Sequence, residues 1–386
     1  ALAGATIGHA LDYDDSYPGA GHPSVPMLSS VLAAATMRDT PITGAELLDA
    51  FVVGFEVMAK FADALAVGHY YKGWHVTCTS GTFGATAAAA RLLGLDRTTT
   101  LTALGIAGSL ASGMQRNFGT TTKPLHSGLA ARNGVLAASL AQLGASADPS
   151  ILDGERGFFD LYGQDRAEPA LLDELGAPYS LVSPGTAIKK YPCCFIAVRP
   201  IDALLRIRAA HSLGPADVES VVCSVPLRAL HAMIYPHPKT GLEGKFSTEY
   251  ILAAALCDGK IGLRSFTDEA VRRPEVLAAM EKVEAREEAR LRPEDPNAKV
   301  SGPAKGGWIE IAVKTRDGRS FTEAEHHPHG GPKNPFGWSD VRAKFLDCAA
   351  YGGYDAARAE RLFGDLEAIG NSTDVLQLLR AFTREE

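Results

Sequence analysis

The segment 79-TSGTFGATAAAARLL-93 decides the fold of this chain. From residue 79 to residue 90 it contains only Gly, Ala, Ser, Thr and one aromatic residue, Phe83. Small side chains allow neighbouring helices to approach closely, so such a helix belongs where several helices meet. We therefore expect residues 79–93 to form the central helix of a bundle.

Helical patterns lie on both sides of this segment. Thr43 and Glu46 have the spacing of a capping box, and Phe51, Phe55 and Met58 recur behind them at helical intervals. The sequence therefore predicts a helix over residues 47–67, together with helices over residues 25–37, 98–114 and 126–143. No convincing strand alternation occurs before residue 195.

The second half of the chain has a mixed character. Residues 217–225 and 308–314 alternate and are rich in β-branched side chains, which predicts strands. Asp317 and Gly318 predict a hairpin turn, with residues 319–323 as the returning strand. Helices are expected over residues 247–256 and 273–283, and again from residue 338 onward.

These patterns predict a mainly α protein with a discontinuous organisation. A large all-helical domain would take residues 1–194 and return at residues 336–386, and a smaller α+β lid domain would be inserted at residues 195–335. Pro-rich or Gly-rich segments lie at both crossovers. Because ligands often bind between domains, we expect a site in the cleft between these two.

Composition argues against several classes of function. The 386 residues carry a net charge of −7 and no long basic run, which argues against a nucleic-acid partner. Gly, Arg and Asp interrupt the Ala-rich segments, so no transmembrane helix is expected. None of the six cysteines forms a CxxC pair and no signal peptide is visible, which predicts reduced thiols in a cytoplasmic protein. The chain opens inside an apparent helix without Met, and we expect its true N-terminus to be missing.

Titratable side chains gather in three short segments. The run 9-HALDYDDS-16, followed by 21-GHPS-24, holds two imidazoles and three carboxylates. The runs 73-GWH-75 and 122-TKPLHSG-128 add His75, Lys123 and His126. Each segment brings a histidine to a helix edge beside Gly or Pro, so we expect one active site built from loops.

The residue types indicate acid–base chemistry on an anionic substrate. Histidine can donate or accept a proton near neutral pH. Lys123, Lys189, Lys190 and Arg116 are candidates to hold anionic oxygens. Such a site fits removal of a carbon-bound proton from a small di- or tricarboxylic acid, with charge stabilisation on the opposite side of the substrate.

Other kinds of site lack sequence support. There is no P-loop, no GxSxG elbow and no GxGxxG after a predicted strand. His326, His327 and His329 lie in a Gly- and Pro-rich loop, where adjacent histidines point apart, and no metal is expected there.

Each candidate also has a structural interpretation. Asp14 or Asp15 could cap a helix, and His9, on an apolar face, could be a hydrogen-bonded core histidine. His75 follows Trp74, and a histidine beside an aromatic residue is often structural. Only the joint occurrence of the three segments favours a site.

The chain resembles the MmgE/PrpD family over almost its whole length. The segments that carry this resemblance are residues 12–16, 22–24, 75–84, 122–128, 190–194, 244–247 and 334–335. The resemblance implies a large helical domain with a smaller α+β lid, usually in a homodimer. Members of the family include 2-methylcitrate dehydratase, cis-aconitate decarboxylase and iminodisuccinate epimerase.

The resemblance also implies which residues form the site. It places Asp12, Ser16, His22, His75 and Lys123 in the pocket. Our own hypothesis is that His75 acts as the base and that His22, tuned by Asp12, acts as the partner acid. Further residues assigned to substrate binding are Arg116, His126, Lys190 and Lys245.

Two positions depart from the pattern of the decarboxylating members. Phe246 stands where those members carry a histidine, and Trp308 replaces a tyrosine. An aromatic hydrocarbon ring cannot transfer a proton, so their complete acid–base set is not expected here. Lys245 agrees with the wider family and could replace the missing cationic group.

We therefore predict a cofactor-independent lyase of a small di- or tricarboxylate, most closely a 2-methylcitrate dehydratase-like hydro-lyase. Epimerisation at a carbon next to a carboxylate is the first alternative, followed by decarboxylation. A polycarboxylate-binding protein without activity is the alternative from another class. The expected partners are the substrate and a second copy of the chain, without a metal, a nucleic acid or a membrane.

Overall fold

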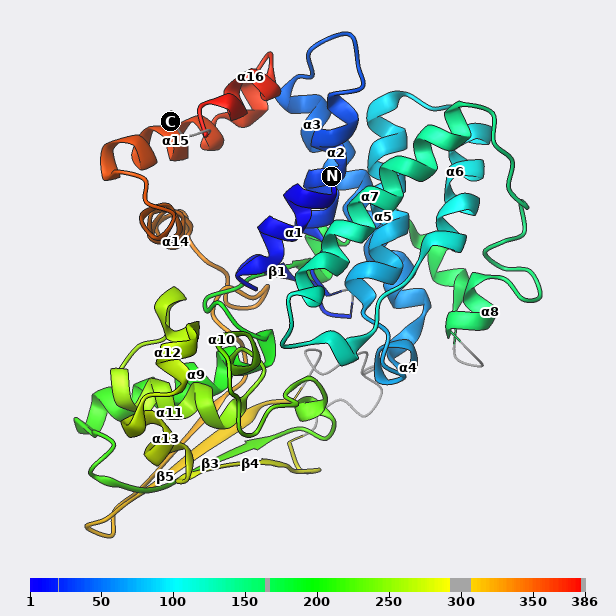
Figure 1. Ribbon diagram of the computed structural model, residues 1–386. Coiled ribbons are helices and arrows are strands. Elements are labelled where there is room, and N and C mark those ends of the chain that lie inside the picture. Colours follow the sequence, from blue (N-terminus) through cyan, green and yellow to red (C-terminus); the bar gives the residue numbers. More distant parts are fainter. Residues whose placement is uncertain (20, 164–166, 292–306, 383–386) are drawn as a thin grey trace.

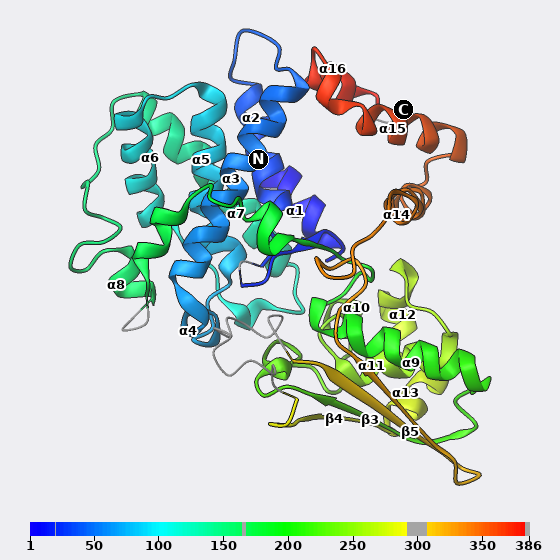
Figure 2. The same ribbon diagram turned by 180° about the vertical axis from the view of Figure 1, so that it is seen from behind.

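The computed structural model describes residues 1–19, 21–163, 167–291 and 307–382. Its first part is a bundle of helices, and its second part contains a four-stranded sheet with helices packed against it (Figures 1 and 2). The mainly helical fold with a smaller mixed part confirms the predicted fold class. The helices of the first part are α1 Leu2–Ala10, α2 Ser24–Ala35, α3 Gly44–Ala64, α4 Ala66–Tyr71, α5 Val76–Leu93, α6 Arg97–Leu110, α7 Thr122–Gln142 and α8 Phe158–Gly163.

Helix α5 is the centre of the bundle, as its small residues predicted. It packs against α2, α3, α6 and α7, and all of its residues except Arg91 and Leu93 are buried. A methyl group added to Gly84 would lie 2.6 Å from the backbone oxygen of Gly54 and 2.6 Å from Met58 Cβ. The contact between α3 and α5 therefore requires the absence of a side chain at Gly84.

Replacing Gly84 by alanine is expected to destabilise the protein. Overpacking costs about 1–3 kcal/mol, whereas alanine gains at most about 1 kcal/mol of helix propensity over glycine. Because the contacted atoms belong to a buried backbone and a Cβ, they cannot move aside cheaply, and the melting temperature should fall. Gly364→Ala is the matched control, since Gly364 lies inside helix α15, Ala356–Glu367, and nothing approaches its added methyl group within 4 Å. Equal melting temperatures for the two variants would contradict the close helix contact.

Helix α3 begins and ends for identifiable reasons. The backbone nitrogen of Glu46 donates to Thr43 Oγ1 at 3.2 Å, and the backbone nitrogen of Thr43 donates to Glu46 Oε2 at 2.8 Å, which confirms the capping box. The helix predicted over residues 47–67 is interrupted, because Ala66 has a φ of 56° and α4 starts there. Helix α6 ends at Leu110, four residues earlier than predicted, because Ala111 is extended.

The sheet has the order β4–β3–β5–β6, with β3 and β4 parallel and the other pairs antiparallel. Its strands are β3 Val218–Val225, β4 Val283–Glu287, β5 Ile309–Thr315 and β6 Ser320–Glu325. In β5 the side chains of Ile309, Ile311 and Val313 are buried in alternation, as the sequence predicted. The predicted hairpin at Asp317 and Gly318 joins β5 to β6 and is confirmed.

One helix of the second part was predicted too long. The prediction over residues 273–283 is wrong at its end, because α13 stops at Met280 and strand β4 begins at Val283. The core here joins strands and helices in one cluster that includes Val221, Ile251 and Ile311. The helices of this part are α9 Val198–His211, α10 Gly241–Gly244, α11 Thr248–Asp258, α12 Asp268–Val271 and α13 Pro274–Met280.

A short strand pair occurs in the region where no strand was expected. Strand β1, Asp15–Ser16, pairs antiparallel with β2, Ala187–Ile188. Strands of two residues are too short to show alternation in a sequence. This pair brings the acidic run near the N-terminus next to the segment that carries Lys189.

The last three helices lead back to the bundle (Figures 1 and 2). The backbone nitrogen of Val375 donates to the Ile42 oxygen at 3.0 Å, and the Val375 side chain is buried in a cluster with Val31 and Leu47. The division into residues 1–194 with 336–386 and residues 195–335 stays a prediction. These helices are α14 Trp338–Tyr351, α15 Ala356–Glu367 and α16 Val375–Arg380.

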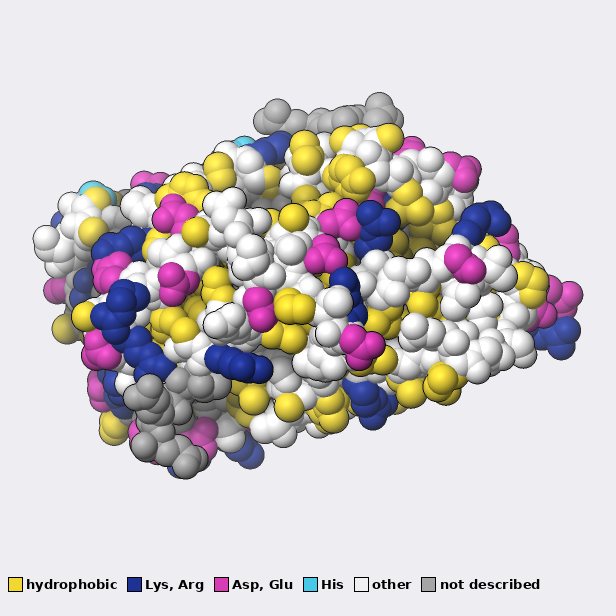
Figure 3. Space-filling view, turned by 90° about the horizontal axis from the view of Figure 1, so that it is seen from above, with side chains coloured by type: hydrophobic (Ala, Val, Ile, Leu, Met, Phe, Trp, Pro, Cys, Tyr) yellow, Lys and Arg dark blue, Asp and Glu magenta, His cyan; other side chains and the backbone are white. Residues whose placement is uncertain are grey.

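The surface is mixed in charge. On the face seen in Figure 3, Lys and Arg side chains are interspersed with Asp and Glu and with hydrophobic groups. Within the described residues, no helix combines the length and the apolar character needed to cross a membrane. The predicted homodimer and the predicted cytoplasmic location stay predictions.

Candidate active site

A cavity lies where the helical bundle meets the second part of the chain. Its polar lining includes Asp12, Ser16, His22, His75 and Lys123, all of which the sequence had assigned to the site. Asp12, Ser16 and His22 come from the segment between α1 and α2. His75 is the residue that precedes α5, and Lys123 lies in the first turn of α7. The apolar lining includes Phe118, Cys194, Phe195, Ile196 and Phe246.

Asp12 is the charged centre of this arrangement. It follows α1 with a φ of 53°, a left-handed conformation that Asp tolerates better than most residues. Its Oδ1 accepts hydrogen bonds from Lys123 Nζ at 2.7 Å and from Lys189 Nζ at 2.6 Å. Burial alone would raise the pKa of Asp12, but the two ammonium groups outweigh it and hold that pKa well below its usual value. Asp12 is therefore an anion shared by two buried cations.

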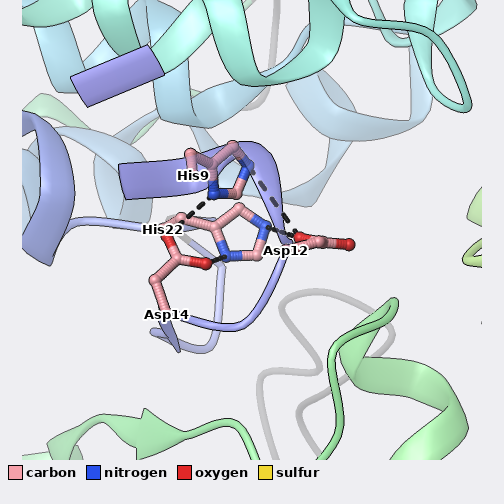
Figure 4. Close-up of side chains that lie close together, drawn as sticks. All are labelled: His9, Asp12, Asp14 and His22. Carbon is pink, nitrogen blue, oxygen red and sulfur yellow. Dashed lines mark hydrogen bonds and ion pairs between the residues drawn. The ribbon is translucent and has the colours of Figure 1, made fainter. Parts of the chain in front are cut away.

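His9 connects this ion group to a second carboxylate. Lys123 Nζ donates to His9 Nε2 at 2.9 Å, so the proton of the neutral ring lies on Nδ1, which donates to Asp14 Oδ2 at 2.8 Å. Burial is the main reason that the pKa of His9 is lowered. Figure 4 shows His9, Asp12 and Asp14 with His22 beside them. His9 thus orients Lys123 and is no isolated core histidine.

His22 presents an unprotonated nitrogen. Its Nδ1 lies 2.6 Å from the backbone oxygen of Asp15, an atom that can only accept, so Nδ1 carries the hydrogen. In the neutral ring Nε2 is then the free acceptor, and it lies 3.9 Å from Asp12 Oδ1. Burial, followed by the charges of Lys189 and Lys123, holds the pKa of His22 well below its usual value. His22 is therefore neutral at pH 7 and able to accept a proton.

His75 is the second imidazole in the cavity. It precedes α5 in an extended conformation, and its Nδ1 lies 2.9 Å from Nδ1 of His126. One of these two nitrogens must carry a hydrogen and donate it to the other, so one ring is protonated on Nδ1 and the other on Nε2. Burial and the neighbouring His126 hold the pKa of His75 well below its usual value, and burial lowers the pKa of His126 to about 4. His126 does not line the cavity itself, and its hydrogen bond influences which nitrogen of His75 carries a hydrogen.

One wall of the cavity is apolar and aromatic. The rings of Phe118 and Phe246 lie 5.3 Å apart between centroids, and both are almost fully buried. Lys123 Nζ lies 5.3 Å from the centre of the Phe246 ring and 5.7 Å from that of Phe118. The position at which the sequence analysis noted a missing histidine is therefore inside the cavity, and it carries no group that transfers protons.

Three cationic residues that the sequence assigned to substrate binding lie outside the lining of the cavity. Arg116 is exposed in a short 3₁₀ helix. Lys190 Nζ donates to Asp202 Oδ1 at 2.6 Å, and Lys245 Nζ donates at 2.7 Å to the backbone oxygens of Leu11 and Pro192. None of the three is among the residues that line the cavity, and their contact with substrate stays a prediction.

Replacing Lys245 by methionine tests which role this lysine has. It is buried, and burial lowers its pKa to about 8. Loss of its two hydrogen bonds leaves buried carbonyls unpaired, which costs about 1–3 kcal/mol, so the melting temperature should fall. Lys282→Met is the matched control, since Lys282 also donates to a backbone oxygen, that of Pro215, but is only partly buried. A raised KM with an unchanged melting temperature would instead show that Lys245 binds substrate.

Sequence reasoning missed or misjudged some members of the site. His9 had a structural interpretation, and Lys189 was one of four candidate cations but was left out of the predicted site, whereas its neighbour Lys190 was included. The signal that could have found His9 was its spacing from Asp12, because residues three apart share a face when a helix ends there. Nothing local distinguishes Lys189 from its neighbour Lys190.

The cluster of His9, Asp12, Asp14 and His22 also has the composition of a metal site, with one ligand atom from each residue within 4.8 Å of the others. Two of these donor atoms, Asp12 Oδ1 and His9 Nε2, are already engaged, whereas Asp12 Oδ2 and Asp14 Oδ1 are buried without a hydrogen-bond partner among the described residues. Lys123 and Lys189 donate to Asp12 Oδ1, and Lys123 also donates to His9 Nε2. A cation bound to Asp12 Oδ1 or His9 Nε2 would have to displace a buried ammonium group, so these two atoms fit an ion network better than a metal centre.

Neutral imidazoles, a buried lysine and a carboxylate meet around one cavity, an arrangement typical of the active site of an enzyme. The chain matches the MmgE/PrpD N-terminal domain over residues 1–169 and the MmgE/PrpD C-terminal domain over residues 191–367. It therefore belongs to the MmgE/PrpD family of enzymes.

Among similar proteins, the cis-aconitate decarboxylase of Homo sapiens is 33% identical over 349 residues, which cover 87% of this chain and 69% of the human protein. The cis-aconitate decarboxylase of Aspergillus terreus is 26% identical over 408 residues, which cover 98% of this chain and 80% of the fungal protein.

Proposed function

We propose that this enzyme is a lyase that transfers a proton to or from a carbon atom of a small di- or tricarboxylate, without a cofactor. The observation that carries the proposal is the meeting of His22, His75 and Lys123 around one cavity, with both imidazoles buried and neutral. Lys123 supplies positive charge for a carboxylate, and the imidazoles supply the proton-transfer groups.

The hydrogen bonds favour particular roles for the two histidines. Because His22 Nδ1 donates to the Asp15 oxygen, its Nε2 is free to accept a proton from carbon. His75 can donate from Nε2 when His126 Nδ1 holds the shared hydrogen. This assignment makes His22 the base and His75 the acid, the reverse of the roles expected from the sequence.

Two reactions fit this machinery. The named relatives favour decarboxylation of an acid like cis-aconitate, and the apolar wall supports it, because removing water from a carboxylate destabilises the ground state before CO₂ leaves. Dehydration is the second candidate, since it needs a base for the carbon-bound proton and an acid for the leaving hydroxide, and the rings of His22 and His75 lie 6.4 Å apart. The phenyl ring of Phe246 counts against a mechanism identical to that of the decarboxylating members.

Proton NMR of the protein in D₂O with cis-aconitate, citrate, 2-methylcitrate and iminodisuccinate distinguishes these reactions. Decarboxylation gives CO₂ and the signals of a product with one carboxylate fewer, whereas dehydration gives the signals of an unsaturated product that keeps every carboxylate. Exchange of a carbon-bound proton without a new product would indicate an epimerase. Binding of these acids without any reaction would reject the lyase and leave a polycarboxylate-binding protein.

The pH dependence of kcat/KM should reflect the buried imidazoles. An ordinary histidine is half protonated near pH 6.5. The lowered pKa of His22 keeps this base neutral at more acidic pH, so kcat/KM should change little between pH 7.5 and about 6 and fall only below that range. Initial rates in overlapping buffers, with folding checked by circular dichroism at each pH, measure this. A half-maximal loss centred near pH 6.5 would contradict the assignment of His22 as a buried base.

A further inference from the structure

We propose that the cavity selects acids that have at most two carboxylates and an apolar substituent over tricarboxylates. This inference rests on the proposed function and narrows its substrate class. It starts from the charges that a bound acid would meet in the cavity and from the side chains of the opposite wall.

Positive charge in the cavity is scarce. Lys123 is the only lysine or arginine among the described residues that line it, and its Nζ already donates to Asp12 and His9. The imidazoles of His22 and His75 add no charge, because their environment keeps them neutral. A trianion placed here would therefore lose its hydration at three carboxylates and find one cation in return.

The other buried cations near the site are engaged in structural contacts. Lys189 Nζ donates to both the side chain and the backbone oxygen of Asp12, at 2.6 and 3.2 Å. Lys344 on α14 donates to the backbone oxygen of Lys189 at 2.6 Å, and Lys245 donates to two backbone oxygens. None of these three lysines lines the cavity, so none is placed to bind a second or third carboxylate there.

Neutral groups allow for one further carboxylate. The hydroxyl of Ser16 lines the cavity, and the ring of His75 can donate a hydrogen bond from Nε2 in one tautomer. Together with Lys123, these donors suit two carboxylates of one small molecule. Two is therefore the largest number of carboxylates that we expect a preferred acid to carry.

The wall formed by Phe118, Cys194, Phe195, Ile196 and Phe246 suits an apolar group instead. Phe118 and Phe246 are 4% and 3% exposed, and Cys194 and Ile196 pack against them. An alkyl group against this wall removes apolar surface from water, whereas a carboxylate there would be desolvated without a partner. The wall therefore favours an acid with an alkyl group at this position over an acid that is otherwise identical but carries a carboxylate there.

A matched pair of ligands tests the inference. Citrate is malate with a carboxymethyl group on carbon 2, and 2-propylmalate carries a propyl group at the same carbon. Cis-aconitate and 2-propylmaleate form the corresponding unsaturated pair. We expect the propyl compound of each pair to have at least a tenfold lower Kd, measured by calorimetry with the full chain, and turnover of either pair is followed by NMR.

The outcomes separate the inference from the proposed function. Tighter binding of citrate or cis-aconitate overturns the inference, and with turnover it leaves the lyase standing. Tighter binding of the propyl acids without any reaction supports the cavity selectivity and rejects the lyase. Binding of none of the four acids overturns the inference.

A variant provides a second measurement. Phe246→His places a polar ring in the wall, and it should shift the ratio of affinities toward the tricarboxylates by about tenfold. Phe321→His is the matched control, because Phe321 lies on β6 and does not line the cavity. An unchanged ratio in Phe246→His, with the protein folded, overturns the role of the wall.

Discussion

Replacing His22 by glutamine is expected to lower kcat/KM by about 10²–10⁴-fold, the usual contribution of a general base. Glutamine can keep the hydrogen bond to the backbone oxygen of Asp15, which His22 Nδ1 now makes at 2.6 Å. It has no nitrogen that accepts a proton at neutral pH. The variant should therefore fold normally and bind substrate while losing turnover, which initial-rate measurements with the substrate identified by NMR will show.

The matched control for this variant is His211→Gln, since His211 lies at the end of α9, away from the cavity, and stacks on Phe321. Its kcat/KM should stay near the wild-type value. If His22→Gln also retains full turnover, His22 is not the base, and the same substitution at His75 becomes the deciding experiment.

Replacing Asp12 by asparagine should have the largest effect on stability. The substitution keeps the shape of the side chain, and asparagine tolerates the left-handed backbone conformation at this position. It leaves the ammonium groups of Lys123 and Lys189, 4% and 0% exposed, without their shared carboxylate. Breaking a buried ion pair in this way costs about 3–5 kcal/mol. The melting temperature should fall by about 4–6 °C, measured by calorimetry.

A surface ion pair gives the comparison. Asp49 pairs with Arg91 at 2.6 Å, but both side chains are more than half exposed, so Asp49→Asn should cost at most about 1 kcal/mol. Equal melting temperatures for the two variants would mean that the lysines find other partners or lose their protons when Asp12 is neutralised. Activity should be lost only in the Asp12 variant, because Asp12 holds Lys123 at the cavity.

Local patterns predicted much of the fold. The small residues of α5, the capping box at Thr43 and the hairpin at Asp317 each follow from interactions within a few residues, and each is present. Strand β4 was missed because three of its five residues are charged or polar and its partner β3 lies about sixty residues earlier in the chain. The break at Ala66 was missed because no glycine or proline marks it.

The site was predictable to the extent that its chemistry is concentrated in the sequence. Asp12, His22, His75 and Lys123 stood out because titratable side chains recur beside Gly and Pro at the edges of helices. The difference between Lys189, whose Nζ bonds Asp12, and Lys190, whose Nζ bonds Asp202, could not be found in the same way. Adjacent residues in an extended segment point to opposite sides, and which side faces the site depends on the strand pairing of β1 with β2.

The sequence by itself determined that a Gly- and Ala-rich helix lies at the centre of a bundle, that a mixed sheet follows, and that histidines and a lysine gather for acid–base chemistry. These properties arise from periodicity, local capping and side-chain chemistry, which act over short distances along the chain. Only the tertiary structure decided which nitrogen of His22 is free, which lysines neutralise Asp12, and that Lys245 bonds backbone oxygens outside the cavity. Hydrogen-bond direction, burial and charge pairing depend on groups that are far apart in sequence, and folding alone brings those groups within reach of one another.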